Sequence, residues 1–275
     1  MFISGSIGIT ILKNNEKILI LLADDHSNDT YCINNLKDHL DITNFLKKEL
    51  KEGNQILLEE VPRDGFNLEE LWPNSPHTQS LKDFFLNEDK IVGIDIRPYL
   101  IPFSWDILDI DNNLMNFSID KYIEQLNDFF HLKGDFYNKI FNPTIKKIII
   151  KNEGLGKHLL YLKNKFIDIK KEIGNENKNI NYYFENNKDI LEDISNLCDE
   201  IMDFNTLLNI FTSNKKTIIH AGLYHSNNML KWLINSYNFK VIYKNGINQL
   251  SPGIASKNYS SCIYLPGINI FGFKD

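Results

Sequence analysis

Residues 6–26 read SIGITILKNNEKILILLADDH. Two runs rich in β-forming residues, 6–12 and 18–23, flank the polar segment 13–17, a pattern typical of a β-hairpin. The second run is aliphatic at every position, which predicts a strand covered on both faces, as in the middle of an α/β sheet. The chain is therefore expected to begin with a hairpin whose second strand enters a central sheet.

Further segments repeat this pattern, with helical segments between them. The predicted strands are 55–58, 90–94, 216–220 and 239–243. One predicted helix begins after a cap at Asp41, and three others cover 67–72, 78–86 and 226–236. Residues 221–225 are predicted to be a turn. Because strands that alternate with helices indicate parallel pairing, we predict an α/β fold. An N-terminal β-hairpin would lead into a mostly parallel central sheet flanked by helices.

The middle of the chain has a different character. Residues 112–214 are polar and helical in pattern, and one stripe holds Leu155, His158, Leu159, Leu162 and Phe166. We predict a single α/β domain over 1–275, in which 112–214 is a helical insert or cap layer. The tail, 251–275, either adds an edge strand or closes over the site.

Composition excludes several classes of protein. The chain has 275 residues, a formal net charge of -6 and a pI near 5.7, whereas nucleic-acid proteins usually carry a basic face. No apolar run reaches the roughly 18–20 residues of a membrane span, and the start lacks the pattern of a secretory signal. Heavy use of Asn, Ile and Lys indicates an AT-rich genome, such as that of a virus or parasite.

The cysteines predict a compartment. Cys32, Cys198 and Cys262 are far apart and form no CxxC motif. We therefore expect neither a metal–thiolate cluster nor a disulfide framework, and an intracellular, cytoplasmic location, in the host cytoplasm if the protein is viral. A nucleophilic role for one of these thiols is disfavoured, because none lies in a glycine-rich turn or beside a histidine.

Ionisable residues follow four of the predicted strands. They are Asp24, Asp25 and His26; Glu59 and Glu60; Asp95; and His220 with His225. The only two arginines, Arg63 and Arg97, also follow strands, and a lysine-rich chain keeps arginine where a planar guanidinium is needed. Because open α/β sheets bind ligands at the carboxyl ends of their strands, these side chains predict a site. They suit a divalent metal (Zn, Mn or Co) or metal-free activation of water.

Each residue also has a structural interpretation. Asp24 and Asp25 could cap a helix and form a turn, and His26 could be a core histidine. Asp95 and Arg97 could form a structural ion pair. Glu59 follows buried residues, so it is either paired or functional. His225 precedes a helix, whose dipole would hold its imidazole neutral and able to bind a metal.

These motifs resemble the TraB/Tiki superfamily, which is related to the erythromycin esterases and the ChaN-like haem-binding proteins. The family's first GxxH motif is matched by Ala23-Asp24-Asp25-His26, with Ala in place of Gly. Its strand-end Glu is matched by Glu59, with Arg63 following. Its Gly-Asp-Arg-Pro element resembles 93–98, and its second GxxH matches Gly222-Leu223-Tyr224-His225. The resemblance covers about residues 6–103 and 215–244.

The resemblance implies a hydrolase acting on a peptide or ester bond. Its catalytic residues would be His26, Glu59 or Glu60, Asp95, Arg97 and His225. The metal ligands would be His26, Glu59 and His225, holding Mn, Co or Zn, as in Tiki-type peptide hydrolysis, while the esterases activate water without a metal. The partner would be a small-molecule or peptide substrate. The alternatives are a haem or small-ligand binding protein on the same fold, and a catalytically inactive interaction protein.

Overall fold

The computed structural model describes much of the chain, in two compact units. The described residues are 1–25, 32, 39–59, 76–85, 88–100, 118–131, 143–174, 178–213, 216–248 and 262–267. One unit, here called the sheet unit, comprises Met1–Gly65, Pro73–Asp95 and Ser213–Asp275. The other, the helical unit, comprises Phe66–Trp72 and Ile96–Thr212. The assignment of 1–275 to a single domain stays a prediction.

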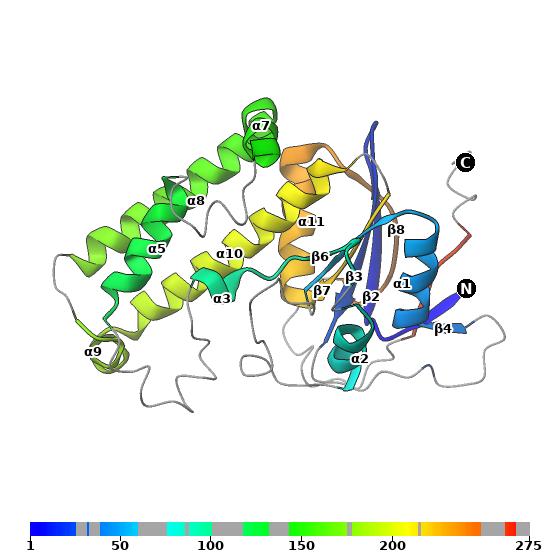
Figure 1. Ribbon diagram of the computed structural model, residues 1–275, viewed down its shortest axis with the longest axis horizontal. Helices are drawn as coiled ribbons and strands as arrows, with labels where there is room; N and C mark the ends of the chain where they lie inside the picture. Colours follow the sequence, from blue (N-terminus) through cyan, green and yellow to red (C-terminus); the bar gives the residue numbers. More distant parts are fainter. Residues whose placement is uncertain are drawn as a thin grey trace. The chain divides into compact units, whose positions relative to one another are not determined.

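A six-stranded sheet forms the centre of the sheet unit (Figure 1). Its order is β6 (Ile91–Gly93), β5 (Gln55–Leu58), β7 (Thr217–Gly222), β3 (Ile18–Asp24), β2 (Gly8–Lys13) and β8 (Lys240–Gly246). The first four strands are parallel, and β2 runs antiparallel to both β3 and β8. The prediction of an α/β fold with a hairpin and a mostly parallel sheet is confirmed.

The hairpin forms where the sequence predicts it. Its register pairs Gly8 with Ala23 and Lys13 with Ile18. In the turn, the Asn14 side-chain oxygen accepts a hydrogen bond from the Lys17 amide at 2.8 Å. Almost every residue of β3 is buried, as expected for a continuously aliphatic strand between neighbours on both sides.

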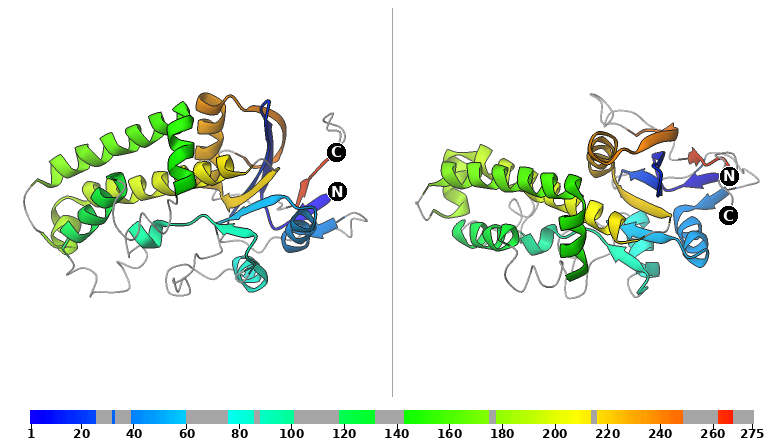
Figure 2. Two further views of the ribbon diagram at one scale, coloured as in Figure 1. Left: turned by 45° about the horizontal axis from the view of Figure 1, so that its top comes forward. Right: turned by 90° about the horizontal axis from the view of Figure 1, so that it is seen from above.

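Helices cover both faces of this sheet (Figure 2). Helices α1 (Ile42–Lys51) and α2 (Pro76–Phe85) pack on one face, where Phe45 and Phe85 join a hydrophobic core cluster. Helix α11 (Leu223–Tyr237) packs on the other face against β3 and β7. As predicted, Asp41 caps α1, and its carboxylate accepts from the Asn44 amide at 2.8 Å.

One local prediction is wrong, and one feature was not predicted. Residues 221–225 are not a turn, because β7 continues to Gly222 and α11 begins directly at Leu223. A second sheet was not foreseen, with the order β4 (His39–Asp41), β1 (Phe2–Ser4) and β9 (Cys262–Tyr264). Of the two roles predicted for the tail, its described part takes the first, since β9 is an edge strand of this sheet. The predicted helix at 67–72 lies outside the described residues.

The cysteine prediction is also corrected. Cys32 and Cys262 form a disulfide between residues 230 positions apart in sequence. Cys262 lies opposite Ser4, so the pairing of β1 with β9 fixes one partner of this bond. Disulfides are typical of oxidising compartments, which argues against the reducing compartment inferred from cysteine number. The cytoplasmic location stays a prediction.

The helical unit is built around one long helix. Helix α10 (Lys188–Thr212) packs against α3 (Arg97–Leu100), α7 (Pro143–Lys151), α8 (Glu153–Ile173) and α9 (Ile180–Asn186). Helix α5 (Asp120–Phe130) contacts α8, where Phe130 stacks on Phe166 with ring centroids 5.1 Å apart. None of the helices in the described residues is long and apolar enough to cross a membrane.

The predicted stripe on α8 faces the core of this unit. Leu155, Leu162 and Phe166 are buried, and His158 packs edge-on against Phe204 of α10, with ring centroids 5.1 Å apart. Burial lowers the pKa of His158 from 6.5 to about 3, so its imidazole is neutral in the folded protein.

This burial predicts a pH dependence of stability. Between pH 6.5 and about 3 the unfolded chain protonates His158 but the folded chain does not. The free energy of unfolding should therefore fall as pH falls, by up to about 1.4 kcal/mol per pH unit. In urea unfolding, the wild type should lose about 2 kcal/mol more than His158→Leu between pH 7 and pH 5. Identical losses in the two proteins would contradict the buried, neutral assignment.

A second prediction concerns two glycines. A Cβ atom on Gly8 would lie 1.7 Å from the Ile247 carbonyl oxygen, a backbone atom that cannot move aside alone. Gly8→Ala should therefore lower the free energy of unfolding by about 3 kcal/mol or more. The control is Gly156→Ala in α8, where the nearest atom is 3.9 Å away, and which should gain about 0.5–1 kcal/mol. Chemical denaturation measures both, and equal effects would refute the close approach at Gly8.

Candidate functional site

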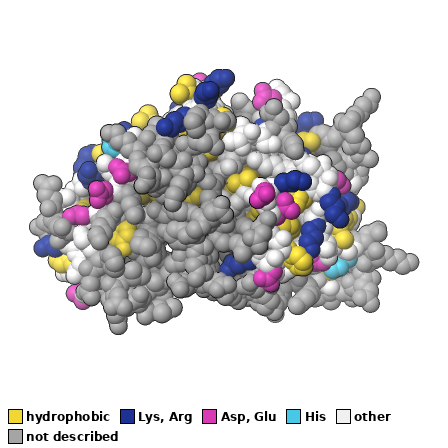
Figure 3. All heavy atoms as spheres, viewed as in Figure 1, with side chains coloured by type: hydrophobic (Ala, Val, Ile, Leu, Met, Phe, Trp, Pro, Cys, Tyr) yellow, Lys and Arg dark blue, Asp and Glu magenta, His cyan; other side chains and the backbone are white. Residues whose placement is uncertain are grey.

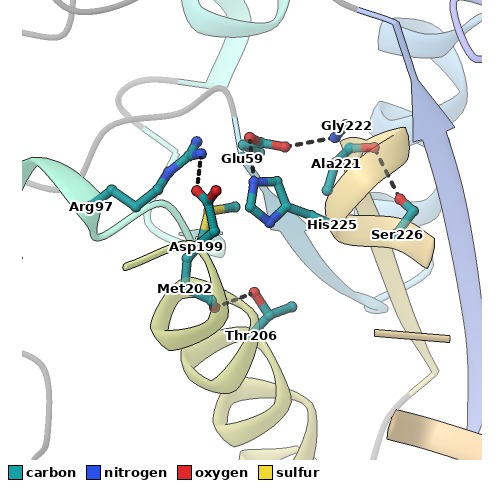
Figure 4. Close-up of polar contacts among 9 residues, drawn as sticks. All are labelled: Glu59, Arg97, Asp199, Met202, Thr206, Ala221, Gly222, His225 and Ser226. Atoms are coloured by element: carbon teal, nitrogen blue, oxygen red, sulfur yellow. Dashed lines mark hydrogen bonds and ion pairs between the residues drawn. The ribbon is translucent and has the colours of Figure 1, made fainter. Parts of the chain in front are cut away.

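Glu59 directly follows β5 and lies beside the junction of β7 with α11 (Figure 4). Its backbone amide donates to the His220 carbonyl oxygen at 3.1 Å, which continues the pairing of β5 with β7. Its side-chain Oε2 accepts a hydrogen bond from the Gly222 amide at 2.6 Å. The side chain is buried, and Gly222 is the N-cap residue of α11, so the carboxylate lies at the positive end of that helix.

His225 lies in the first turn of α11 and faces the same carboxylate. Its Nε2 is 3.7 Å from Glu59 Oε1, and both side chains are more than nine-tenths buried. The Tyr224 ring meets the His225 ring edge-on at 5.3 Å between centroids. The turn is held by Ser226, whose hydroxyl donates to the Ala221 carbonyl oxygen at 3.0 Å. The structure thus brings together two of the predicted site residues, Glu59 and His225.

The end of β3 brings a further acid to this edge of the sheet. Asp24 pairs in register with Gly222 of β7 and is buried. Because β7 lies between β5 and β3, Gly222 has Glu59 on one side and the end of β3 on the other. Asp25 is half-buried. The predicted site residues His26 and Glu60, and also Arg63, lie outside the described residues.

Asp95 and Arg97 belong to different units. Asp95 is buried two residues beyond β6 in the sheet unit. Arg97 begins α3 in the helical unit, and its Nη1 donates to Asp199 Oδ1 of α10 at 2.8 Å. The arginine therefore has an acidic partner that the sequence did not suggest.

The separation of Glu59 and His225 is compatible with a shared divalent metal ion. Two ligands about 2.0–2.2 Å from one Zn ion can lie up to roughly 4 Å apart, so the 3.7 Å separation suits shared ligation. No group of three or more potential ligands occurs within the part of the chain that the structure describes. His26, which would be the third ligand, is outside that part.

Several residues of the site were not predicted to take part. The Gly222 amide and Ser226 take part because β7 passes directly into α11. A turn was predicted from the sequence at this junction, so both were missed. His220, by contrast, was among the predicted strand-end residues, but it is fully buried in β7, between Leu22 and Leu58, and is part of the sheet core. Cys198 is buried in α10, and burial raises the pKa of its thiol, which disfavours a nucleophilic role.

No protein-family model, curated protein or solved structure matches the chain. The similarity to the TraB/Tiki superfamily therefore rests on the motifs in the sequence, and membership stays a prediction.

The Arg97–Asp199 pair can be tested by a double-mutant cycle. Both side chains are mostly buried, with 16% and 20% exposed, so their interaction is only partly screened by solvent. Arg97→Gln and Asp199→Asn, alone and combined, should show a coupling energy of about 1–2 kcal/mol in denaturant unfolding. Losses that add within about 0.3 kcal/mol would show that the pair does not hold α3 to α10.

Proposed function

We propose that the chain is a hydrolase of a peptide or ester bond, of the TraB/Tiki and erythromycin-esterase type. The observation that carries the proposal is the buried pair of Glu59, at the end of β5, and His225, in the first turn of α11. A carboxylate is costly to bury unless it is hydrogen-bonded, as Glu59 is by the Gly222 amide, and ligands of open α/β sheets bind at the carboxyl ends of the strands.

Glu59 is the positioned base in this proposal. Its Oε2 is fixed by the Gly222 amide, which leaves Oε1 directed at His225. The 3.7 Å gap between Oε1 and Nε2 exceeds a direct hydrogen bond and suits two partners of one water molecule. Glu59 would accept the proton of that water as it attacks a carbonyl carbon, and His225 would orient it or pass a proton to the leaving group.

A divalent metal fits the same two residues, with His26 as the third ligand by the family resemblance. When bound, such an ion would lower the pKa of a coordinated water to about 7. Asp95 and Arg97 enter the proposal through the resemblance alone. By that resemblance Arg97, whose Nη1 donates to Asp199, would hold a substrate carbonyl or carboxylate.

Conservative variants test the role of the pair. Glu59→Gln keeps an oxygen that can accept from Gly222 but removes the base, so kcat/KM on peptide or ester substrates should fall about 100-fold or more. His225→Gln should have a similar effect, with the melting temperature changed by only a few degrees. His131→Gln, at an exposed histidine in the helical unit, is the matched control and should be neutral. Unaltered activity in Glu59→Gln would overturn the proposal.

Elemental analysis tests the metal. The purified protein should contain near-stoichiometric Mn, Co or Zn, and the His26→Ala/His225→Ala double variant should not. An empty site in a folded, active wild type would leave metal-free water activation. A folded protein with neither metal nor hydrolase activity would exclude both forms of the hydrolase.

A further inference from the structure

Helices α7 and α8 carry a charge opposite to that of the whole chain. Residues 143–173 contain eight lysines and three acidic residues, a local net charge of +5 in a chain of net charge -6. Four of these lysines are exposed or half-exposed and have no carboxylate partner among the described residues: Lys147, Lys151, Lys163 and Lys170. The two helices therefore present a local positive field to solvent.

Exposed aliphatic side chains lie among these lysines. Ile150 is 83% exposed at the end of α7, and Leu160 is 58% exposed on α8. On α8, Leu160, Lys163, Ile167 and Lys170 follow one another at intervals of three, four and three residues, which places them along one side of the helix. Figure 3 shows lysine and hydrophobic side chains together over α7.

These side chains are not the packing face of the two helices. The core of the helical unit takes a different side of α8, with Leu155, Leu162 and Phe166 buried. Exposed apolar groups of this size, mixed with unpaired cations, are typical of a surface with a partner. We call Lys147, Ile150, Lys151, Leu160, Lys163 and Lys170 the α7–α8 surface.

We propose that the α7–α8 surface docks peripherally on a membrane rich in anionic lipid. The lysines complement the negative headgroups, and the isoleucine and leucine can enter the boundary between headgroups and acyl chains. Lysines would also attract the phosphates of a nucleic acid, but the exposed isoleucine and leucine would add little to that contact, which favours lipid as the partner. The inference is independent of the proposed hydrolase activity.

Vesicle co-sedimentation of the full chain tests this docking. The wild type should pellet with vesicles of 70% phosphatidylcholine and 30% phosphatidylserine at about 50 mM NaCl, and only weakly with pure phosphatidylcholine or at about 500 mM NaCl. Lys147→Glu/Lys151→Glu should lower the partition coefficient at least about tenfold, because each cation near an anionic surface adds to binding. Ile150→Ser should lower it about threefold through lost insertion.

Matched variants on the sheet unit separate this surface from charge in general. Lys240→Glu/Lys244→Glu makes the same charge change at exposed lysines of β8, and Ile234→Ser removes an isoleucine that is 41% exposed on α11. Both should bind vesicles like the wild type. Equal losses in the control and test variants, or no binding at low salt, would overturn the proposal. So would tight binding of a DNA or RNA duplex that depends on Lys147 and Lys151 but not on Ile150.

Discussion

The hydrogen bond from the Gly222 amide to the Glu59 carboxylate depends on two other features of the sheet unit. It requires β5 and β7 to be parallel neighbours in the register that pairs Leu58 with His220. It also requires β7 to pass into α11 without a loop, so that the Gly222 amide is free to donate at the helix start. A one-residue shift of β5 along β7 would leave the buried Glu59 carboxylate without its hydrogen bond, at a cost of about 1–3 kcal/mol or more. The strand register therefore fixes the geometry of the site.

The same constraint explains why part of the described site could be predicted from sequence. Aliphatic residues at 18–23, 56–58 and 218–219 mark buried parallel strands, and parallel strands end at one edge of the sheet. Glu59 and His225 could therefore be expected to meet. The direct junction at Gly222 could not, because glycine followed by leucine, tyrosine and histidine is as compatible with a turn as with a helix start.

Contacts between distant segments were beyond the reach of local patterns. Arg97 binds Asp199, which is 102 residues away in sequence, because α3 packs on α10. Cys32 forms a disulfide with Cys262 across 230 residues, and the strand that carries Cys262 is only three residues long. Strands of three residues, such as β1 and β9, are too short to show a periodicity in the sequence. Their pairing is therefore set by the rest of the fold.

Net charge misleads for a related reason. The value of -6 predicts no attraction to polyanions, yet it averages over the whole chain, while a charged partner responds only to groups within about 8–10 Å at physiological ionic strength. The excess of five positive charges on α7 and α8 is therefore felt locally, whatever the remaining residues carry. Helix α8 both packs in the core of the helical unit and presents lysines to solvent. Its periodicity allows this, because buried and exposed residues alternate every three to four positions. Its inner side builds the core with α10, so its outer side is left to hold lysine and leucine without loss of packing.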